Sequence, residues 1–159
     1  MLDFRIFKMT KKQVIQAIEH AQEYHLAQME KVAQLVRGEK VKNPTPRMKD
    51  ECEFGQWIYG DASHTKTLLG IQFYKSMEVI HEFWHLTYEK IYDIYYIEDK
   101  EGLFTKFLPL RRKLPQEEYE LVQKYYHDLE QATEDLLEAL TASKRRILAL
   151  KERVFTSID

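Results

Sequence analysis

Three long stretches of this sequence repeat apolar residues at alternating spacings of three and four, the period of one face of an α-helix. The first follows a helix-capping threonine, Thr10, and extends for about 25 residues. The second runs from about residue 67 to residue 98, and the third from residue 115 to about residue 154. No segment alternates as a β-strand does. The pattern predicts an all-α fold, an antiparallel four-helix-type bundle with a short extra helix that begins at Cys52.

The apolar positions of each stretch lie on one face of the predicted helix. In the first stretch they are Val14, Ile18, Ala21, His25, Gln28, Val32 and Leu35. In the second they are Phe73, Met77, Ile80, Trp84, Thr87, Ile91 and Ile94. In the third they are Val122, Tyr126, Leu129, Thr133, Leu136, Leu140, Ser143, Ile147, Leu150 and Val154. We expect the third stretch to be one long helix or a helix broken near residues 141–143.

The composition excludes several classes of protein. A net charge of −2 gives no general signal for binding nucleic acids or other polyanions. No apolar run approaches the roughly 18 residues needed to span a bilayer, and residues 1–5 lack the organisation of a secretory signal. A chain of 159 residues is expected to form one domain, and its single cysteine fits a reducing cytoplasm. We therefore expect a cytoplasmic protein that binds neither membranes nor nucleic acids.

The single cysteine, Cys52, and the histidine pair His81 and His85 are the residues that carry chemistry. A lone cysteine makes no internal disulfide, so its thiol is available for metal ligation or for redox reactions. Histidines spaced i, i+4 lie about 40° apart around a helix and about 6 Å apart along it, so both can face one ion. A thiolate combined with imidazoles is typical of a zinc site.

A tetrahedral zinc site needs a fourth ligand from another helix. The remaining histidines are His20, His25, His64 and His127. His20 and His25 are about 140° apart around the first predicted helix, so at most one of them faces a shared site. His25 lies on the apolar stripe, and we choose it on that ground. Taken singly, such a histidine pair is more often a core or surface feature, and a lone buried cysteine is more often inert.

The sequence Cys-x-Phe-Gly-x-Trp at residues 52–57, followed by the His81–His85 pair, resembles the chemoreceptor zinc-binding domain, a bacterial sensory module. In that family a first-helix histidine, the motif cysteine and the two later histidines bind zinc. The resemblance therefore implies a Zn²⁺ site made by His25, Cys52, His81 and His85. It also implies a family-like core at about 14–97, an elaborated link at 99–115 and a long C-terminal helix at 116–154.

The resemblance leads to an expected function. Members sense zinc, or oxidants such as hypochlorous acid, through the zinc–thiolate bond, and the family often works as a dimer. We expect a homodimer that pairs through the C-terminal heptad, and a signalling partner from chemoreceptor or cyclic-di-GMP machinery. No such output region follows in this sequence, and Met1 favours a stand-alone sensor. Four protein ligands leave no open coordination position, so we do not expect an enzyme.

Two alternatives remain open at this point. The histidines are also compatible with a helical-bundle metalloprotein, either DinB-like or of the hemerythrin or di-iron type, in which Cys52 has no role. Glu78 and Glu82 each precede a histidine by three residues, as in di-iron sites, but both lie on one predicted helix. The other alternative is a metal-free helical protein that acts only through interactions.

Overall fold

The computed structural model describes residues 9–60, 63–96 and 114–156, except for the side chains of residues 63–65 and 156. Every regular element in these residues is helical, which confirms the all-α prediction. The helices are α1 (Lys11–Val36), α2 (Glu53–Tyr59), α3 (Ser63–Leu69), α4 (Ile71–Tyr95), α5 (Gln116–Ala149) and α6 (Arg153–Thr156).

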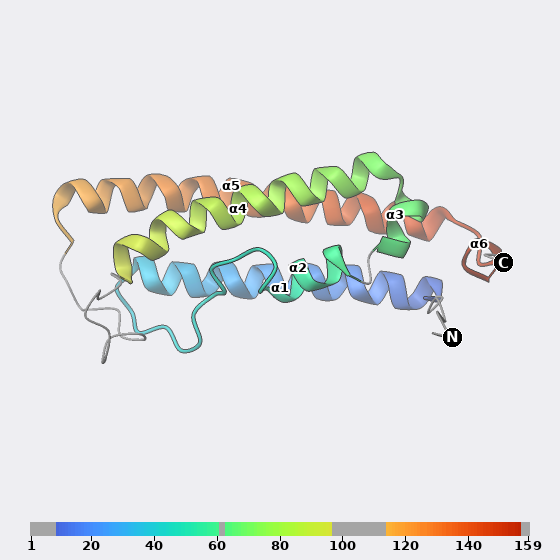
Figure 1. The fold of residues 1–159 in the computed structure, drawn as a ribbon, viewed down its shortest axis with the longest axis horizontal. Helices are drawn as coiled ribbons and strands as arrows, with labels where there is room; N and C mark the ends of the chain where they lie inside the picture. The colour runs from blue at the N-terminus through green and yellow to red at the C-terminus, as the bar shows by residue number, and fades with distance from the viewer. Residues whose placement is uncertain (1–8, 61–62, 97–113, 157–159) are drawn as a thin grey trace, which may run out of the picture.

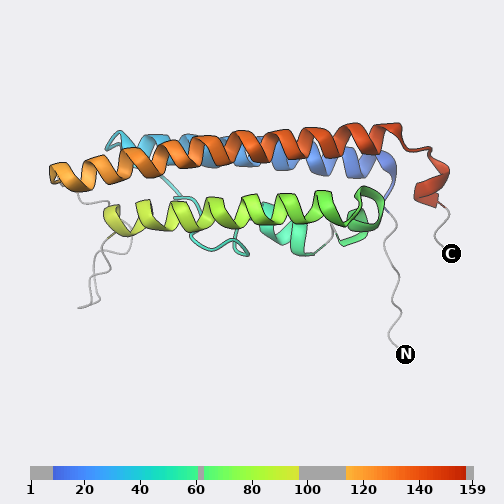
Figure 2. The same cartoon turned by 90° about the horizontal axis from the view of Figure 1, so that it is seen from above.

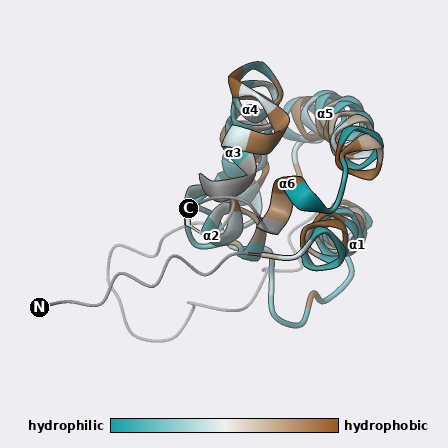
Figure 3. Ribbon diagram, turned by 90° about the vertical axis from the view of Figure 1, so that its right-hand side faces the viewer, coloured by the Kyte–Doolittle hydropathy of each residue, from teal (hydrophilic) through white to brown (hydrophobic). Residues whose placement is uncertain are grey.

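The three long helices form the body of the bundle. α1 and α4 run in the same direction, and α5 runs in the opposite direction and packs along both of them (Figure 1). The same alignment is visible from above (Figure 2). Viewed along the bundle, α2 lies at the fourth corner, between α1 and α4 (Figure 3). The bundle prediction is therefore confirmed, with short helices on its fourth side.

The ends of α1 and α5 are fixed to each other. Thr10 and Gln13 form a capping box at the start of α1, which confirms the helix cap predicted at Thr10. The Lys11 ammonium donates hydrogen bonds to the carbonyls of Leu148 and Leu150, at 2.9 and 2.7 Å, and so satisfies acceptors at the end of α5. α5 continues through residues 141–143, so the break that we considered there is absent, and the helix ends at Ala149 instead.

The prediction for the second long helix is wrong at its beginning. The helix was expected to run unbroken from about residue 67, but Gly70 separates α3 from α4. Gly70 has a φ of +87°, in the left-handed region that favours glycine, so the chain turns there before α4 begins. At the other end, residues 97–98 lie outside the described part of the structure, as do residues 99–113 of the predicted link.

The buried side chains gather in two clusters along the bundle. One includes Ile18, Phe54 and Met77, and the other is built around Trp84 and Tyr88. The predicted stripe of α5 is largely buried between α1 and α4, with Val122, Leu129, Leu136, Leu140 and Ile147 all at 0% exposure. None of the described helices combines the length and apolar character needed to cross a membrane.

Candidate metal centre

Cys52 is the N-cap of α2, the short helix that the sequence predicted at this motif. Its sulfur accepts a hydrogen bond from the Gly55 backbone N–H at 3.2 Å, and its thiol donates to the Lys49 carbonyl at 3.4 Å. The residue is 1% exposed. The cap geometry therefore holds the thiol inside the bundle, at the point where α2 lies between α1 and α4.

Gly55 is required by the tight turn that precedes α2. A Cβ atom at this position would collide with the carbonyl of Lys49 and would lie 3.3 Å from the Cα of Asp50. The close neighbour of this position is the chain's own backbone, three residues before Cys52.

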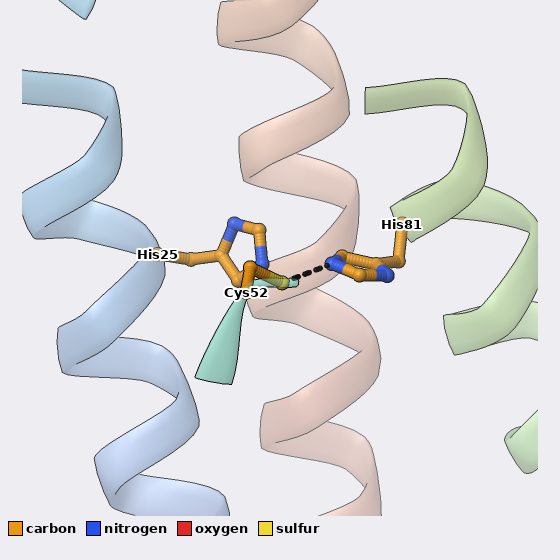
Figure 4. Close-up of side chains that lie close together, drawn as sticks. All are labelled: His25, Cys52 and His81. Atoms are coloured by element: carbon orange, nitrogen blue, oxygen red, sulfur yellow. Dashed lines mark hydrogen bonds between the residues drawn. The ribbon is translucent and has the colours of Figure 1, made fainter. Parts of the chain in front are cut away.

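His25 from α1 and His81 from α4 meet Cys52 inside the bundle (Figure 4). One potential ligand atom from each of the three residues lies within 4.8 Å of the others. His81 Nε2 is 3.1 Å from the Cys52 sulfur, and the His25 and His81 rings are edge-to-face with centroids 5.2 Å apart. Both histidines are 1% exposed or less. Three of the four predicted ligands are thus brought together from separate helices.

His85 lies next to this group but is outside it by the same distance criterion. Its ring contacts His81, with centroids 4.7 Å apart. Its Nδ1 is 3.0 Å from the carbonyl oxygen of Arg47, so Nδ1–H donates and Nε2 is the nitrogen with a free lone pair. This is the arrangement that metal-ligating histidines usually adopt.

Four histidine nitrogens in this region are buried and have no hydrogen-bond partner among the described residues. They are both ring nitrogens of His25, Nδ1 of His81 and Nε2 of His85. Leaving a buried polar atom unpaired costs about 1–3 kcal/mol, so a core with several of them is unfavourable unless a ligand binds there. Three imidazoles and a thiol are a donor set that suits zinc.

Burial controls the protonation of these groups. It lowers the pKa of His25 to about 3 and that of His81 to about 2, and it also lowers the pKa of His85. The imidazoles are therefore neutral, which is the form that binds a metal. Burial raises the pKa of the Cys52 thiol to about 11, against the opposing effect of the Gly55 N–H. In the metal-free protein, desolvation thus outweighs the stabilisation that the start of α2 offers to a thiolate.

Aromatic side chains shield the group from water. The Phe54 ring lies against His81 and His25, with centroids 4.6 and 5.1 Å apart, and Trp57 packs behind it. The Trp84 ring closes another side, 5.3 Å from His25, and its indole N–H is satisfied by Thr133.

Two of the remaining histidines lie away from this group, and the side chain of the third is outside the described residues. His20 is exposed and pairs with Glu53 at 3.1 Å. His127 is exposed on α5, and the side chain of His64 is outside the described residues. Glu82 pairs with Lys49, and the potential metal-binding group found in the described residues contains no carboxylate. The arrangement therefore does not favour a di-iron site.

The metal-free protein is expected to lose stability as the pH falls below about 6.5. In the unfolded chain His25 and His81 have pKa values near 6.5, whereas in the folded chain they stay neutral to about pH 3. The unfolded state then binds more protons, and well below pH 6.5 each histidine lowers the unfolding free energy by about 1.4 kcal/mol per pH unit.

Denaturant unfolding between pH 7 and pH 5, in the presence of a chelator, measures this slope. His25→Leu is the comparison variant, because it removes one titrating group and two unpaired nitrogens. Averaged over this pH range, its slope should be smaller than that of the wild type by about 1 kcal/mol per pH unit. Equal slopes for the two proteins would show that His25 is not held neutral by burial.

The arrangement agrees with a comparison to known protein families. Residues 25–92 match the family described as the chemoreceptor zinc-binding domain, and the match confirms the resemblance noted in the sequence. The matched segment begins at His25 and includes Cys52, His81 and His85. No curated protein and no solved structure matched the chain.

Proposed function

We propose, from the premise that residues 25–92 form a chemoreceptor zinc-binding domain, that this protein is a zinc-binding signal-input module. The proposed ligands are His25, Cys52, His81 and His85. The observation that carries the proposal is the set of buried histidine nitrogens without partners among the described residues, which surrounds a buried thiol. Such a core is explained by an ion that these atoms would bind.

The proposed site acts on the fold because its ligands come from different parts of the bundle. His25 belongs to α1, Cys52 to the start of α2, and His81 and His85 to α4. When bound, zinc would stabilise the Cys52 thiolate and add its binding free energy to that of folding. Occupancy of the site would thus tighten the contact between α1, α2 and α4, and zinc availability would be read as a change in bundle stability.

We further propose that the Cys52 thiolate is the element through which oxidants act. Hypochlorous acid transfers chlorine to a thiolate with loss of hydroxide, and water then replaces chloride to give the sulfenic acid. That product is a poorer ligand than the thiolate, so zinc affinity should fall. The 1% exposure of Cys52 means that an oxidant must pass the packed side chains around it.

We propose a binding protein rather than an enzyme, because four protein ligands leave no open position on zinc. A homodimer and a partner from chemoreceptor or cyclic-di-GMP signalling remain predictions. The heptad of α5 does not provide the expected pairing surface, since Leu129, Leu136 and Leu140 are buried inside the chain. A dimer would have to use another face.

Zinc release during oxidation tests the function. Protein purified without added metal should carry about one zinc per chain, and stepwise addition of hypochlorite should release it to a chromogenic chelator. Release is expected at low molar ratios, before methionine and tyrosine are modified, because a thiolate is the most reactive group present. Release only after general damage would refute oxidant sensing, and purified protein that neither carries nor binds zinc would refute the whole proposal.

A further inference from the structure

The chain between α1 and α2, residues 37–52, contacts both α1 and α4; we call it the crossover segment. At its centre the Arg47 guanidinium contacts Glu89 at 2.7 Å and Asp93 at 3.2 Å. The same guanidinium lies 5.6 Å from the centre of the Tyr92 ring. Arg47 therefore contacts one face of α4 through two carboxylates and an aromatic ring.

The backbone of the crossover segment is held by the same helix. The Tyr88 hydroxyl donates to the Thr45 carbonyl at 3.0 Å, and the Thr45 hydroxyl donates to the Gln28 carbonyl of α1 at 3.4 Å. Thr45 and Tyr88 are buried. The segment consequently has a fixed position between α1 and α4 where it passes the candidate metal centre.

Arg47 contacts α4 along a single row of side chains. His85, Glu89 and Asp93 are spaced by four residues, so they follow one another on the same face of the helix. The Arg47 carbonyl accepts the hydrogen bond from His85 Nδ1–H at 3.0 Å, while its guanidinium binds the next two residues of the row. One residue thus joins the two ion pairs to the histidine.

We propose that Arg47 is a positioning residue of the metal centre. Its guanidinium sets the register of the crossover segment on α4, and its carbonyl then fixes the tautomer and the orientation of His85, with Nε2 turned to the metal. The inference rests on the proposed zinc function, and it gives a role to a backbone carbonyl outside the four ligands. A planar guanidinium that bridges two carboxylates fixes geometry more strictly than an ammonium does.

The Arg47–Glu89 ion pair is less exposed than the ion pairs made by Arg37. The side chains of Arg47 and Glu89 are 33% and 34% exposed, whereas those of Arg37 and its partner Glu30 are 51% and 61% exposed. Exposed pairs contribute little to stability. Arg37, which also binds Glu39 at 2.7 Å, therefore serves as a matched control with two carboxylate partners and no contact to the metal centre.

The test uses the full chain with Arg47→Gln, which keeps the backbone carbonyl and removes the ion pairs with Glu89 and Asp93. Long-range ¹⁵N–¹H NMR of the metal-free protein reads the His85 tautomer directly. We expect the Nδ1–H tautomer in the wild type and in Arg37→Gln, and a mixture of tautomers in Arg47→Gln. Zinc affinity, measured by competition with a chelator, should fall about 10-fold in Arg47→Gln, as for other groups that orient ligands, and stay unchanged in Arg37→Gln.

A second variant tests the inference even if Arg47→Gln does not fold. Glu89→Gln with Asp93→Asn removes the partners of Arg47 and should cause the same changes, with helicity followed by circular dichroism. Wild-type tautomer and wild-type zinc affinity in folded Arg47→Gln, or in this double variant if Arg47→Gln does not fold, would overturn the inference. A wild type that binds no zinc would refute the proposed function, whereas the tautomer comparison would still decide whether Arg47 positions His85.

Discussion

Replacing Cys52 by alanine is expected to lower the zinc affinity of the chain by about 100- to 1,000-fold. Structural zinc sites with four protein ligands bind with about 10–16 kcal/mol, so one ligand corresponds to about 2.5–4 kcal/mol. The thiolate is the only anionic donor of the proposed set, and water would replace it poorly in a site closed by Phe54 and Trp84. The loss should therefore lie toward the upper end of this range.

Competition with a chromogenic chelator measures the change. His85→Ala should also weaken binding by about 100-fold or more if His85 is the fourth ligand. His20→Ala is the control, because His20 is exposed on α1 and pairs only with an exposed glutamate among the described residues. Unchanged affinity in Cys52→Ala would contradict the ligand assignment, and unchanged affinity in His85→Ala alone would restrict the site to three protein ligands.

Gly55→Ala is expected to destabilise the protein by on the order of 3 kcal/mol or more and to weaken zinc binding as well. The added methyl group would collide with the Lys49 carbonyl. The carbonyl is backbone and the Cβ is fixed to backbone, so neither can rotate away, and either α2 or the turn before it must move. Cys52 lies between them, and its sulfur would be displaced from His81.

Gly38→Ala is the matched control for this effect. Gly38 has a φ of +74° and no atom within 4 Å of the position that a Cβ would occupy. Its replacement should cost about 1–2 kcal/mol from backbone strain alone and should leave zinc affinity unchanged. Thermal unfolding and chelator competition on the two variants separate strain from displacement of the site. Wild-type zinc affinity in Gly55→Ala would show that the turn does not position Cys52.

The helical periodicity predicted most of the fold because burial of one face imposes the same period on sequence and structure. The stripes of α1 and α5 correspond to buried faces, and the cap at Thr10 marks the first helix correctly. The sequence did not predict the break at Gly70, since a single glycine inside an apolar stripe does not indicate a positive φ. The direction of the α5 stripe, inward rather than toward a second chain, depends on tertiary packing that periodicity does not encode.

The residue types of the site were predictable, whereas its supporting groups were not. The spacing of His81 and His85, and the position of His25 on the stripe, follow from helix geometry. The Arg47 carbonyl carries no sequence signal, because every residue has one and only the fold selects which of them meets His85. The raised pKa of Cys52 also has no sequence signal, since burial depends on neighbours such as Phe54 that fold around the thiol.

X-ray absorption at the zinc edge tests the central claim most directly, because it separates sulfur from lighter ligand atoms and counts bound imidazole rings by the scattering of their outer atoms. For protein purified without added metal, the proposal predicts about one zinc per chain. Its shell should hold three nitrogen atoms at about 2.0–2.1 Å and one sulfur atom at about 2.3 Å. Absence of zinc, a shell without sulfur, or a water oxygen in place of one histidine nitrogen would contradict it.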